Sequence, residues 1–162
     1  MKKIGIISDT HSHWDERYAH YFKSCDEIWH AGDFGTLAIA DRLRETAPLR
    51  GVYGNIDGIE IRREFPEVQR FQCEGVTVLM KHIGGYPGRY DRSIAWELRD
   101  NPPQLFIAGH SHIAKVMYDR RLGFLHVNPG AAGLYGQQPV RTLVRLVIDG
   151  MQIRDLEMIE LN

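Results

Sequence analysis

The sequence predicts an α/β fold in which two mixed β-sheets are stacked and helices lie outside them. Two observations predict it. Up to about residue 53, apolar strand-like runs alternate with helical segments, which is the βαβ rhythm of a parallel sheet. Most of the later strand-like runs follow one another closely, as in antiparallel hairpins. A chain of 162 residues with 43% hydrophobic content can bury one core. We therefore expect a single domain over residues 1–162.

The first half of the pattern sets up the parallel strands. Apolar runs predict strands at residues 3–8, 27–30 and 49–53. Residues 15–23 have helical composition, and a second helix is expected from an N-cap at Thr36 to about Glu45. Each of these strands is followed within three residues by a polar side chain, namely Asp9, Asp33 or Asn55.

The rest of the chain predicts short strands and one more helix. Strand-like runs occupy residues 61–65, 70–73 and 76–82, and the last two are joined by Glu74-Gly75. Residues 83–90 are too rich in glycine and proline for regular structure, and Asp91 can cap a helix that runs to about residue 100. Further strands are expected at 105–108, 114–118, 125–128, 142–148 and 152–156, with Asp149-Gly150 as a tight turn.

Composition narrows the class of protein. With 20 basic and 21 acidic side chains, no global field attracts nucleic acid or an anionic membrane. The two cysteines, Cys25 and Cys73, lack the spacing of a zinc or redox pair, and free thiols are typical of a reducing compartment. The brief apolar run at the N-terminus does not fit a signal peptide, and no stretch reaches membrane-spanning length. We expect a soluble cytoplasmic protein.

Side chains that bind metal ions occur in five clusters, most of them directly after a predicted strand. The clusters are Asp9-Thr10-His11, Gly32-Asp33, Gly54-Asn55, His82 and Gly109-His110-Ser111-His112. Polar groups at strand ends converge on the ligand site of an α/β sheet. Asp9 and His11, two residues apart, would share one face of an extended segment. Each motif alone is weak, but their joint occurrence predicts a two-metal phosphoesterase.

The ligand types indicate which metal ions could bind and what chemistry these ions would supply. Mixed oxygen and nitrogen donors without thiolate favour manganese, iron, cobalt, nickel or zinc over calcium. A carboxylate such as Asp33 can bridge two cations, which two-metal hydrolases hold about 3.5–4 Å apart, and which lower the pKa of a bridging water from 15.7 towards about 7. A metal-bridging hydroxide would then attack phosphorus in line. No protein nucleophile or glycine-rich nucleotide fingerprint can be read from the sequence.

On these motifs the chain resembles the calcineurin-like metallophosphoesterases, and most closely their small single-domain bacterial and archaeal phosphodiesterases. The resemblance spans nearly all 162 residues and fills seven ligand positions. It implies a four-layer αββα sandwich of two mixed sheets flanked by helices. It also implies one metal on Asp9, His11 and His112, a second metal on Asn55, His82 and His110, and Asp33 as the bridge. Two divalent ions are therefore expected, manganese first, with nickel, zinc, iron or cobalt as alternatives.

The sequence departs from the family beside Asn55. Many relatives carry a histidine there, thought to protonate the leaving group, and this chain has Ile56. General acid catalysis contributes about 10²–10⁴-fold in rate, so aryl phosphodiesters, whose leaving groups need little protonation, should be preferred. Asn55 and Asp57 are the candidate catalytic residues, although Asp57 also fits a turn residue that bonds its own loop. Arg89 is a candidate phosphate contact. His30 is either a packed core residue or a support behind the ligands.

The predicted function is hydrolysis of small phosphodiesters. A phosphomonoesterase of the same fold is an alternative, and a non-catalytic scaffold that binds proteins is another, although scaffolds of this fold tend to have lost ligands. A scaffold would present an exposed apolar patch. Self-association through residues 130–139 or an edge strand is left open, and no specific affinity for nucleic acid or membranes is expected.

Overall fold

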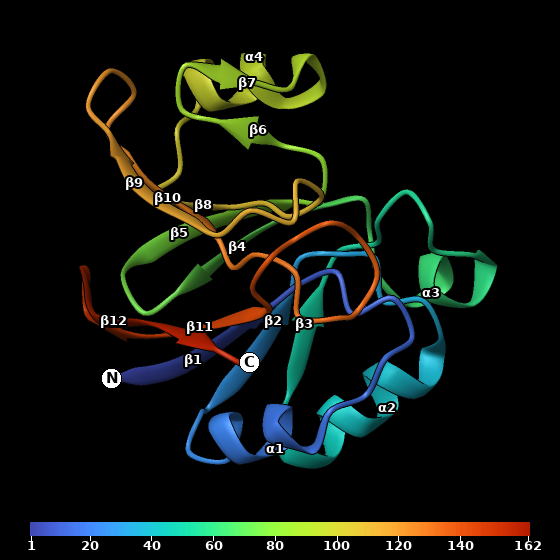
Figure 1. Cartoon of the computed structure of the whole chain (residues 1–162). Helices are drawn as coiled ribbons and strands as arrows, with labels where there is room; N and C mark the ends of the chain where they lie inside the picture. Colours follow the sequence, from blue (N-terminus) through green and yellow to red (C-terminus); the bar gives the residue numbers. More distant parts are fainter.

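The protein folds into two five-stranded mixed sheets, seen in a computed structural model that describes all residues from Met1 to Asn162 (Figure 1). The first sheet has the strand order β12 (Gln152–Glu160), β11 (Thr142–Asp149), β1 (Lys2–Ile7), β2 (Glu27–His30) and β3 (Leu49–Gly51). The second has the order β4 (Val68–Cys73), β5 (Val76–Lys81), β8 (Leu105–Ile107), β10 (Phe124–Asn128) and β9 (Lys115–Asp119). The predicted αββα architecture is confirmed.

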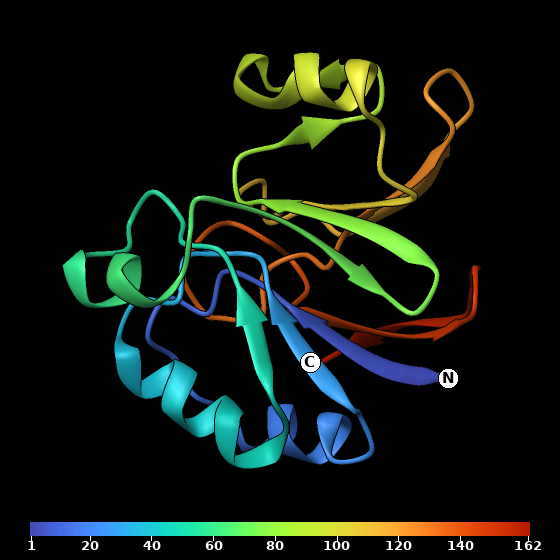
Figure 2. The ribbon, with the colours of Figure 1, turned by 180° about the vertical axis from the view of Figure 1, so that it is seen from behind.

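Helices cover the outer faces of the stacked sheets. Three of them, α1 (Glu16–Phe22), α2 (Leu37–Thr46) and α3 (Ile59–Glu64), belong to the side of the first sheet, and α4 (Arg92–Asp100) covers the second (Figures 1 and 2). The central core, which includes Ile6, Trp29 and Met80, lies between the sheets. Two further clusters pack the helices onto the outer sheet faces, one around Leu43 and one around Leu98.

The parallel strands bring the functional loops to one end of the sandwich. Strands β1, β2 and β3 run parallel in the first sheet, and β5 and β8 run parallel in the second. Main-chain hydrogen bonds join the loops that follow them: Asp9 N–H donates to the Gly32 carbonyl at 3.0 Å, and Gly109 N–H donates to the His82 carbonyl at 2.9 Å. Loops far apart in the sequence therefore lie side by side at the ends of these strands.

Two predicted elements are wrong. Residues 61–65 are not a strand, because α3 covers residues 59–64. A strand would bury Arg63 together with Ile61 and Phe65, whereas the helical i, i+4 spacing buries only Ile61 and Phe65 and leaves Arg63 exposed. Residues 83–90 are not irregular throughout, since Gly85–Tyr86 (β6) and Arg89–Tyr90 (β7) pair as a short hairpin.

Several boundaries also differ. Strand β3 ends at Gly51 rather than at residue 53, and β12 continues to Glu160 along its whole pairing with β11. Thr36 occupies the N-cap position of α2, but its side chain makes no capping hydrogen bond. Both cysteines are free thiols, as expected. None of the helices combines the length and apolar character that crossing a bilayer demands.

Candidate metal centre

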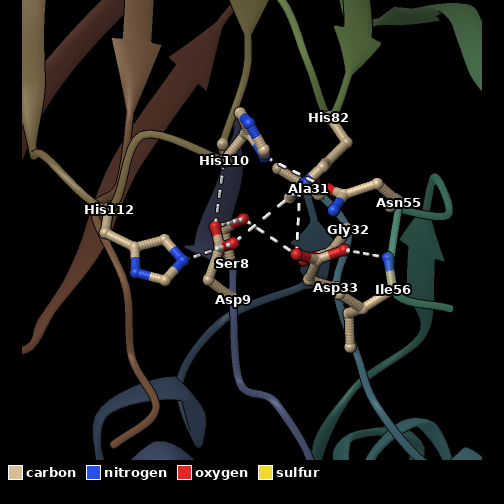
Figure 3. Close-up of polar contacts among 12 residues, drawn as sticks. Ser8, Asp9, Ala31, Gly32, Asp33, Asn55, Ile56, His82, His110 and His112 are labelled. Atoms are coloured by element: carbon tan, nitrogen blue, oxygen red, sulfur yellow. Dashed lines mark hydrogen bonds and ion pairs between the residues drawn. The ribbon is translucent and has the colours of Figure 1, made fainter. Parts of the chain in front are cut away.

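The side chains of the predicted ligand clusters converge between the two sheets. Figure 3 shows the carboxylates of Asp9 and Asp33 at the centre, with His82, His110 and His112 reaching towards them from the second sheet. The ligand atoms form two trios, each with all atoms within 4.8 Å of one another. The trios are Asp9, His11 and His112, and Asp33, His82 and His110. Every predicted ligand except the amide Asn55 falls into a trio.

Each carboxylate has one oxygen held by the protein and one directed at imidazoles. Asp9 Oδ2 accepts hydrogen bonds from the Ser8 hydroxyl at 2.6 Å and from His110 N–H at 3.1 Å. Its Oδ1 lies 3.1 Å from His112 Nε2 and 3.6 Å from His11 Nε2. The carboxylate is thus fixed through one atom, which leaves the other available as a ligand.

Asp33 repeats this arrangement between the trios. Its Oδ1 accepts a hydrogen bond from Ile56 N–H at 3.1 Å. Its Oδ2 lies 3.2 Å from Nε2 of His82 and 3.4 Å from Nε2 of His11. One oxygen of Asp33 therefore contacts an imidazole of each trio, the position that a bridging carboxylate requires.

Hydrogen bonds set the proton positions of two imidazoles. His82 Nδ1 lies 2.8 Å from the Ala31 carbonyl, and His112 Nδ1 lies 3.0 Å from Gln138 Oε1. Because these oxygens only accept, Nδ1 carries a proton in both rings, and Nε2 is the ring atom that faces the carboxylates and is available to a metal. Supporting acceptors of this kind orient metal-binding histidines in other proteins.

Asn55 lies next to the second trio. Its Oδ1 is 3.1 Å from Nδ1 of His110, and both side chains are solvent-exposed. Two of the three residues predicted to hold the second metal therefore contact each other directly. Figure 3 shows the Asn55 amide on the same side as Asp33 and His82.

The backbone reaches this geometry by a route that the sequence did not indicate. Five of the seven predicted ligands have positive φ, namely Asp9 (54°), His11 (44°), Asp33 (60°), His110 (70°) and His112 (63°). The expectation that Asp9 and His11 share a face of an extended segment is wrong, because β1 ends at Ile7 and the chain turns through left-handed conformations. Such conformations cost free energy in residues other than glycine and cluster at functional sites.

Two glycines permit the close packing of these loops. A Cβ atom at Gly54 would overlap Oδ1 of Asp33. One at Gly109 would overlap the Ser8 hydroxyl and lie 2.9 Å from Asp9 Oδ2. The glycines that precede Asn55 and His110 are therefore required by the approach of neighbouring backbone to the carboxylates.

The electrostatics of the centre favour ionised carboxylates. Burial raises the pKa of the Asp9 carboxyl, but its contacts with His11, His112 and His82 outweigh burial, so the net pKa is well below the usual range. Asp33 follows the same pattern, with His82 as the main opposing partner. For His82, the nearby carboxylates outweigh burial and raise the pKa, whereas burial lowers the pKa of His110. Contact with Asp9 raises the pKa of His112.

Asp57 is buried and bonds main-chain groups of two loops. Its Oδ2 accepts hydrogen bonds from the N–H groups of Gly54 at 2.8 Å, Asp33 at 3.0 Å and Phe34 at 3.3 Å, while Oδ1 accepts one from Gly35 N–H at 2.9 Å. Of the two interpretations that the sequence left open, this geometry describes a carboxylate that organises the loops. It fastens the segment that carries Asp33 to the segment that carries Asn55.

Arg89 and His30 occupy different surroundings. Arg89 is exposed on β7 and lines a pocket of about 530 Å³ together with His110 and Arg92. His30 is fully buried behind the ligands, where Nε2 lies 3.1 Å from the Thr10 hydroxyl and Nδ1 accepts a hydrogen bond from Gly32 N–H at 3.0 Å. Burial lowers its pKa to about 3, so the ring is neutral. It supports the loops before Asp33 and also packs in the core.

Sequence reasoning missed three residues that contact the ligands. Ser8 holds Asp9, Gln138 holds His112, and the ring of Tyr135 stacks on His11 with centroids 4.9 Å apart. Ser8 directly precedes Asp9, so its proximity could have been noticed. Gln138 and Tyr135 come from a distant loop, residues 131–141, in which no local pattern predicts contact with the site.

The two trios are candidate sites for divalent transition metal ions. Asp9 Oδ1, His11 Nε2 and His82 Nε2 are buried and have no hydrogen-bond partner. Buried polar atoms without partners are rare in folded proteins, and here all three point to one centre. The donor set of imidazole nitrogens and carboxylate oxygens suits manganese, iron, cobalt, nickel or zinc. Two candidate clusters are present, and they do not specify which of these metals is bound.

Comparisons with known proteins agree with this geometry. A family model described as the calcineurin-like phosphoesterase superfamily domain matches residues 1–151. A probable metallophosphoesterase of Methanothermobacter thermautotrophicus is 32% identical over 117 residues, which cover 67% of this chain and 66% of that protein. The chain thus aligns with just under two thirds of that relative's length.

Solved structures share the fold. An archaeal phosphodiesterase superposes with a TM-score of 0.78 at 22% identity, covering 98% of this chain and 99% of that one. Vps29 of Entamoeba histolytica, solved in complex with Zn²⁺, superposes with a TM-score of 0.73 at 18% identity, covering 99% of each chain. At these identities the likeness concerns the fold alone.

Proposed function

This chain belongs to the calcineurin-like phosphoesterase superfamily, and from that premise we propose that it is a phosphodiesterase that works with two divalent metal ions. The observation that carries the proposal is the position of Asp33 Oδ2, within 3.4 Å of one imidazole from each trio. A likeness in fold to an archaeal phosphodiesterase supports the choice of ester.

The proposed ligand roles follow the two trios. Asp9, His11 and His112 hold one ion, His82 and His110 hold the other together with the Asn55 amide oxygen, and Asp33 is shared. We expect manganese, with nickel, zinc, iron or cobalt as substitutes. Bound there, two cations would supply a hydroxide nucleophile at neutral pH and neutralise charge on the phosphoryl oxygens. The chain itself contributes ionised carboxylates and imidazoles with fixed lone pairs.

The leaving group determines which esters the site can cleave. Ile56 is 46% exposed beside Asn55 and carries no proton to donate. The carboxylate of Asp57 bonds four main-chain N–H groups, so we propose that it positions the loops rather than acting as the acid. Esters with good leaving groups, such as aryl phosphodiesters, should therefore be the best substrates.

Arg89 is the proposed contact for an anionic part of the substrate. It forms no salt bridge, and its pocket is also lined by Gly109 and by His110, a member of the second trio. Arginine binds phosphate oxygens through two parallel hydrogen bonds. We further propose that residues 1–162 act as one domain and that the protein works in the cytoplasm, where free Cys25 and Cys73 remain reduced.

A protein-binding scaffold is the second candidate function. The fold neighbours include Vps29 chains, whose name refers to vacuolar protein sorting. The edge strand β9 exposes three consecutive apolar side chains, Val116, Met117 and Tyr118, as a docking surface would. The full set of seven metal-binding side chains favours the enzyme.

The test uses protein stripped of metal by a chelator and reloaded with manganese, nickel, zinc or magnesium. Turnover of bis(p-nitrophenyl) phosphate and of p-nitrophenyl phosphate is then measured for each ion. We expect activity with at least one transition metal, no activity in the stripped protein, and a higher kcat/KM for the diester. A higher kcat/KM for the monoester would reverse the proposed specificity. The absence of turnover with every ion would favour the scaffold.

A further inference from the structure

The loop of residues 131–141 is fastened to the metal centre at its base. Ala132 N–H donates to the Ser8 carbonyl at 2.9 Å, and Gly133 N–H donates to the Asp9 carbonyl at 3.0 Å. The Tyr18 hydroxyl donates to the Ala132 carbonyl at 2.7 Å. The sequence left open whether this segment serves self-association. In the structure its base packs against the residues that present Asp9.

Gln138 fixes the tip of the same loop. Its amide nitrogen donates to the carbonyls of Tyr135 at 3.0 Å and Gly133 at 3.2 Å, and its amide oxygen accepts from His112. Gly136 has a φ of 116°, and a Cβ there would collide with the His112 ring. The loop thus touches the first trio at two points and holds Tyr135 between them.

Tyr135 has one face on the metal centre and the other in solvent. Its ring stacks on the imidazole of His11, with centroids 4.9 Å apart and planes inclined by 21°. The residue is nevertheless 69% exposed. A large aromatic side chain that is held in place by a hydrogen-bonded loop and still open on one face is a surface on which a planar group can stack.

Some apolar side chains are exposed near the trios. Ile56, 46% exposed, flanks the second trio, and Leu134, 63% exposed, is the neighbour of Tyr135. A pocket of about 520 Å³, within the usual size range of small-molecule sites, shares His110 and His112 with the centre, and Ile113, Val140 and Met158 line it together with polar residues such as Gln138 and Glu160. Apolar walls beside a charged centre suit a substrate with an anionic phosphate and a hydrophobic organic part.

We propose that Tyr135 is a specificity-determining residue that stacks on a planar aromatic substituent of the phosphodiester. The proposal rests on the proposed function and names its substrate class: diesters in which the group that stays on phosphorus carries an aromatic ring. Stacking on an aromatic side chain tolerates many rings, because each presents a π face.

The test compares two diesters that release the same leaving group. Bis(p-nitrophenyl) phosphate and methyl p-nitrophenyl phosphate both yield p-nitrophenolate but retain an aryl or a methyl group. We expect Tyr135→Ala to lower the ratio of their kcat/KM values about tenfold, through a higher KM for the aryl diester. Tyr135→Phe should keep most of the aryl preference, because the phenyl ring remains. Tyr118→Ala, at an exposed tyrosine of β9, is the matched control and should leave the ratio unchanged.

Two results would overturn the proposal. An equal loss of kcat/KM on both diesters in Tyr135→Ala would show that the ring does not distinguish an aryl from a methyl group on phosphorus. A Tyr135→Phe variant as impaired as Tyr135→Ala would show that the hydroxyl, and not the ring, acts. Thermal unfolding of each variant checks that the fold is intact.

A binding measurement separates this proposal from the proposed function. If the wild-type protein hydrolyses neither diester with any ion, the proposed function fails, and stacking is then tested by calorimetry with phenylphosphonate and methylphosphonate on zinc-loaded protein. We expect phenylphosphonate to bind about tenfold more tightly in the wild type and to lose that advantage in Tyr135→Ala. Equal affinities in the wild type would overturn the stacking proposal independently of catalysis.

Discussion

The two sheets contribute different chemistry to the candidate metal centre. Loops after the first sheet provide both carboxylates, Asp9 and Asp33, and loops after the second provide three of the four imidazoles in the trios. We call the trio residues from the first sheet, Asp9, His11 and Asp33, the acidic half of the site, and those from the second sheet, His82, His110 and His112, the imidazole half. The acidic half carries fixed negative charge, whereas the imidazoles must lose protons before they bind metal. Neither sheet holds a complete trio, so the site exists only where the two are stacked.

Each sheet also orients a ligand of the other. The N–H of His110, from the second sheet, holds the carboxylate of Asp9, and the Ala31 carbonyl, from the first sheet, holds the imidazole of His82. These reciprocal hydrogen bonds couple the geometry of the acidic half to that of the imidazole half. Substitutions in either half can show how strongly the two depend on each other.

The largest effect is expected from breaking the acidic half at Asp33. Asp33→Asn removes the charge shared by both trios and should lower kcat/KM on the order of 10³-fold, since a metal pair contributes several kcal/mol to the transition state. Metal content and diester turnover measure it. Asp100→Asn, an exposed carboxylate on α4, is the control. Wild-type metal content and activity in Asp33→Asn would refute the bridging role.

Breaking the imidazole half through its support should have a smaller effect. Gln138→Ala removes the acceptor that orients His112, and such losses typically cost 10–100-fold in metal affinity. Titration of stripped protein with Zn²⁺ should show weaker binding of one ion and little change in the other. Gln137→Ala, at the exposed neighbour, is the control. Equal weakening of both ions would mean that the two trios do not bind their ions independently.

Asp57 tests the rigidity of the acidic half. Asp57→Asn replaces acceptors with an NH₂ group that faces main-chain donors, so the free energy of unfolding should fall by about 1–3 kcal/mol. Urea unfolding of metal-free protein measures it. Asp41→Asn, at an exposed residue of α2, should change stability by less than about 0.5 kcal/mol. A loss of activity without any loss of stability would instead support a catalytic role for Asp57.

The smallest effect is expected at His126, one of two buried histidines, one in each sheet. Both ring nitrogens of His30 have partners, whereas neither nitrogen of His126 on β10 makes a hydrogen bond of good geometry. His126→Leu should therefore be neutral or stabilise the fold by about 1 kcal/mol at pH 7, while His30→Leu should destabilise it by about 1–3 kcal/mol. Urea unfolding of both variants measures the difference. The opposite ranking would contradict this account.

The same pair makes a prediction about pH. Burial lowers the pKa of His126 to about 4 and that of His30 to about 3. Below the unfolded pKa of 6.5 the unfolded chain therefore binds more protons than the folded protein, and the free energy of unfolding decreases as the pH is lowered. In His126→Leu the slope of the free energy of unfolding against pH, between pH 6 and 4.5, should be smaller by one proton, roughly 1.4 kcal/mol per pH unit. Parallel stability curves for the variant and the wild type would show that His126 does not contribute.

The strand pattern predicted most of the fold. The alternation up to residue 53 and the hairpins after it indicated both sheets, because strand length and turn residues are local signals. It failed at α3, where Ile61 and Phe65 share a face in a strand as well as in a helix. Only the exposure of Arg63, which a strand would bury, distinguishes the helix from the strand. The burial of a side chain depends on tertiary packing, which the local sequence does not contain.

The sequence predicted which side chains gather at the site, but not which residues hold those side chains in place. The six charged or imidazole ligands converge as the motifs indicated. Their left-handed backbone did not follow from the residue types, because aspartate and histidine are extended or helical in most contexts. Gln138 and Tyr135 reach the centre only through the path of the 131–141 loop, and that path is set by bonds to Ser8 and Asp9.

The left-handed conformations of Asp9, His11, Asp33, His110 and His112 have a consequence for how such a protein changes under mutation. Glycine at these positions would relax the backbone, at a cost in flexibility of the unfolded chain, and would remove the ligand. Stability and metal binding thus favour different residues at the same positions. A lineage selected for robustness alone would lose its metal-binding residues before its sandwich, and would keep the shape of an enzyme after the chemistry had gone.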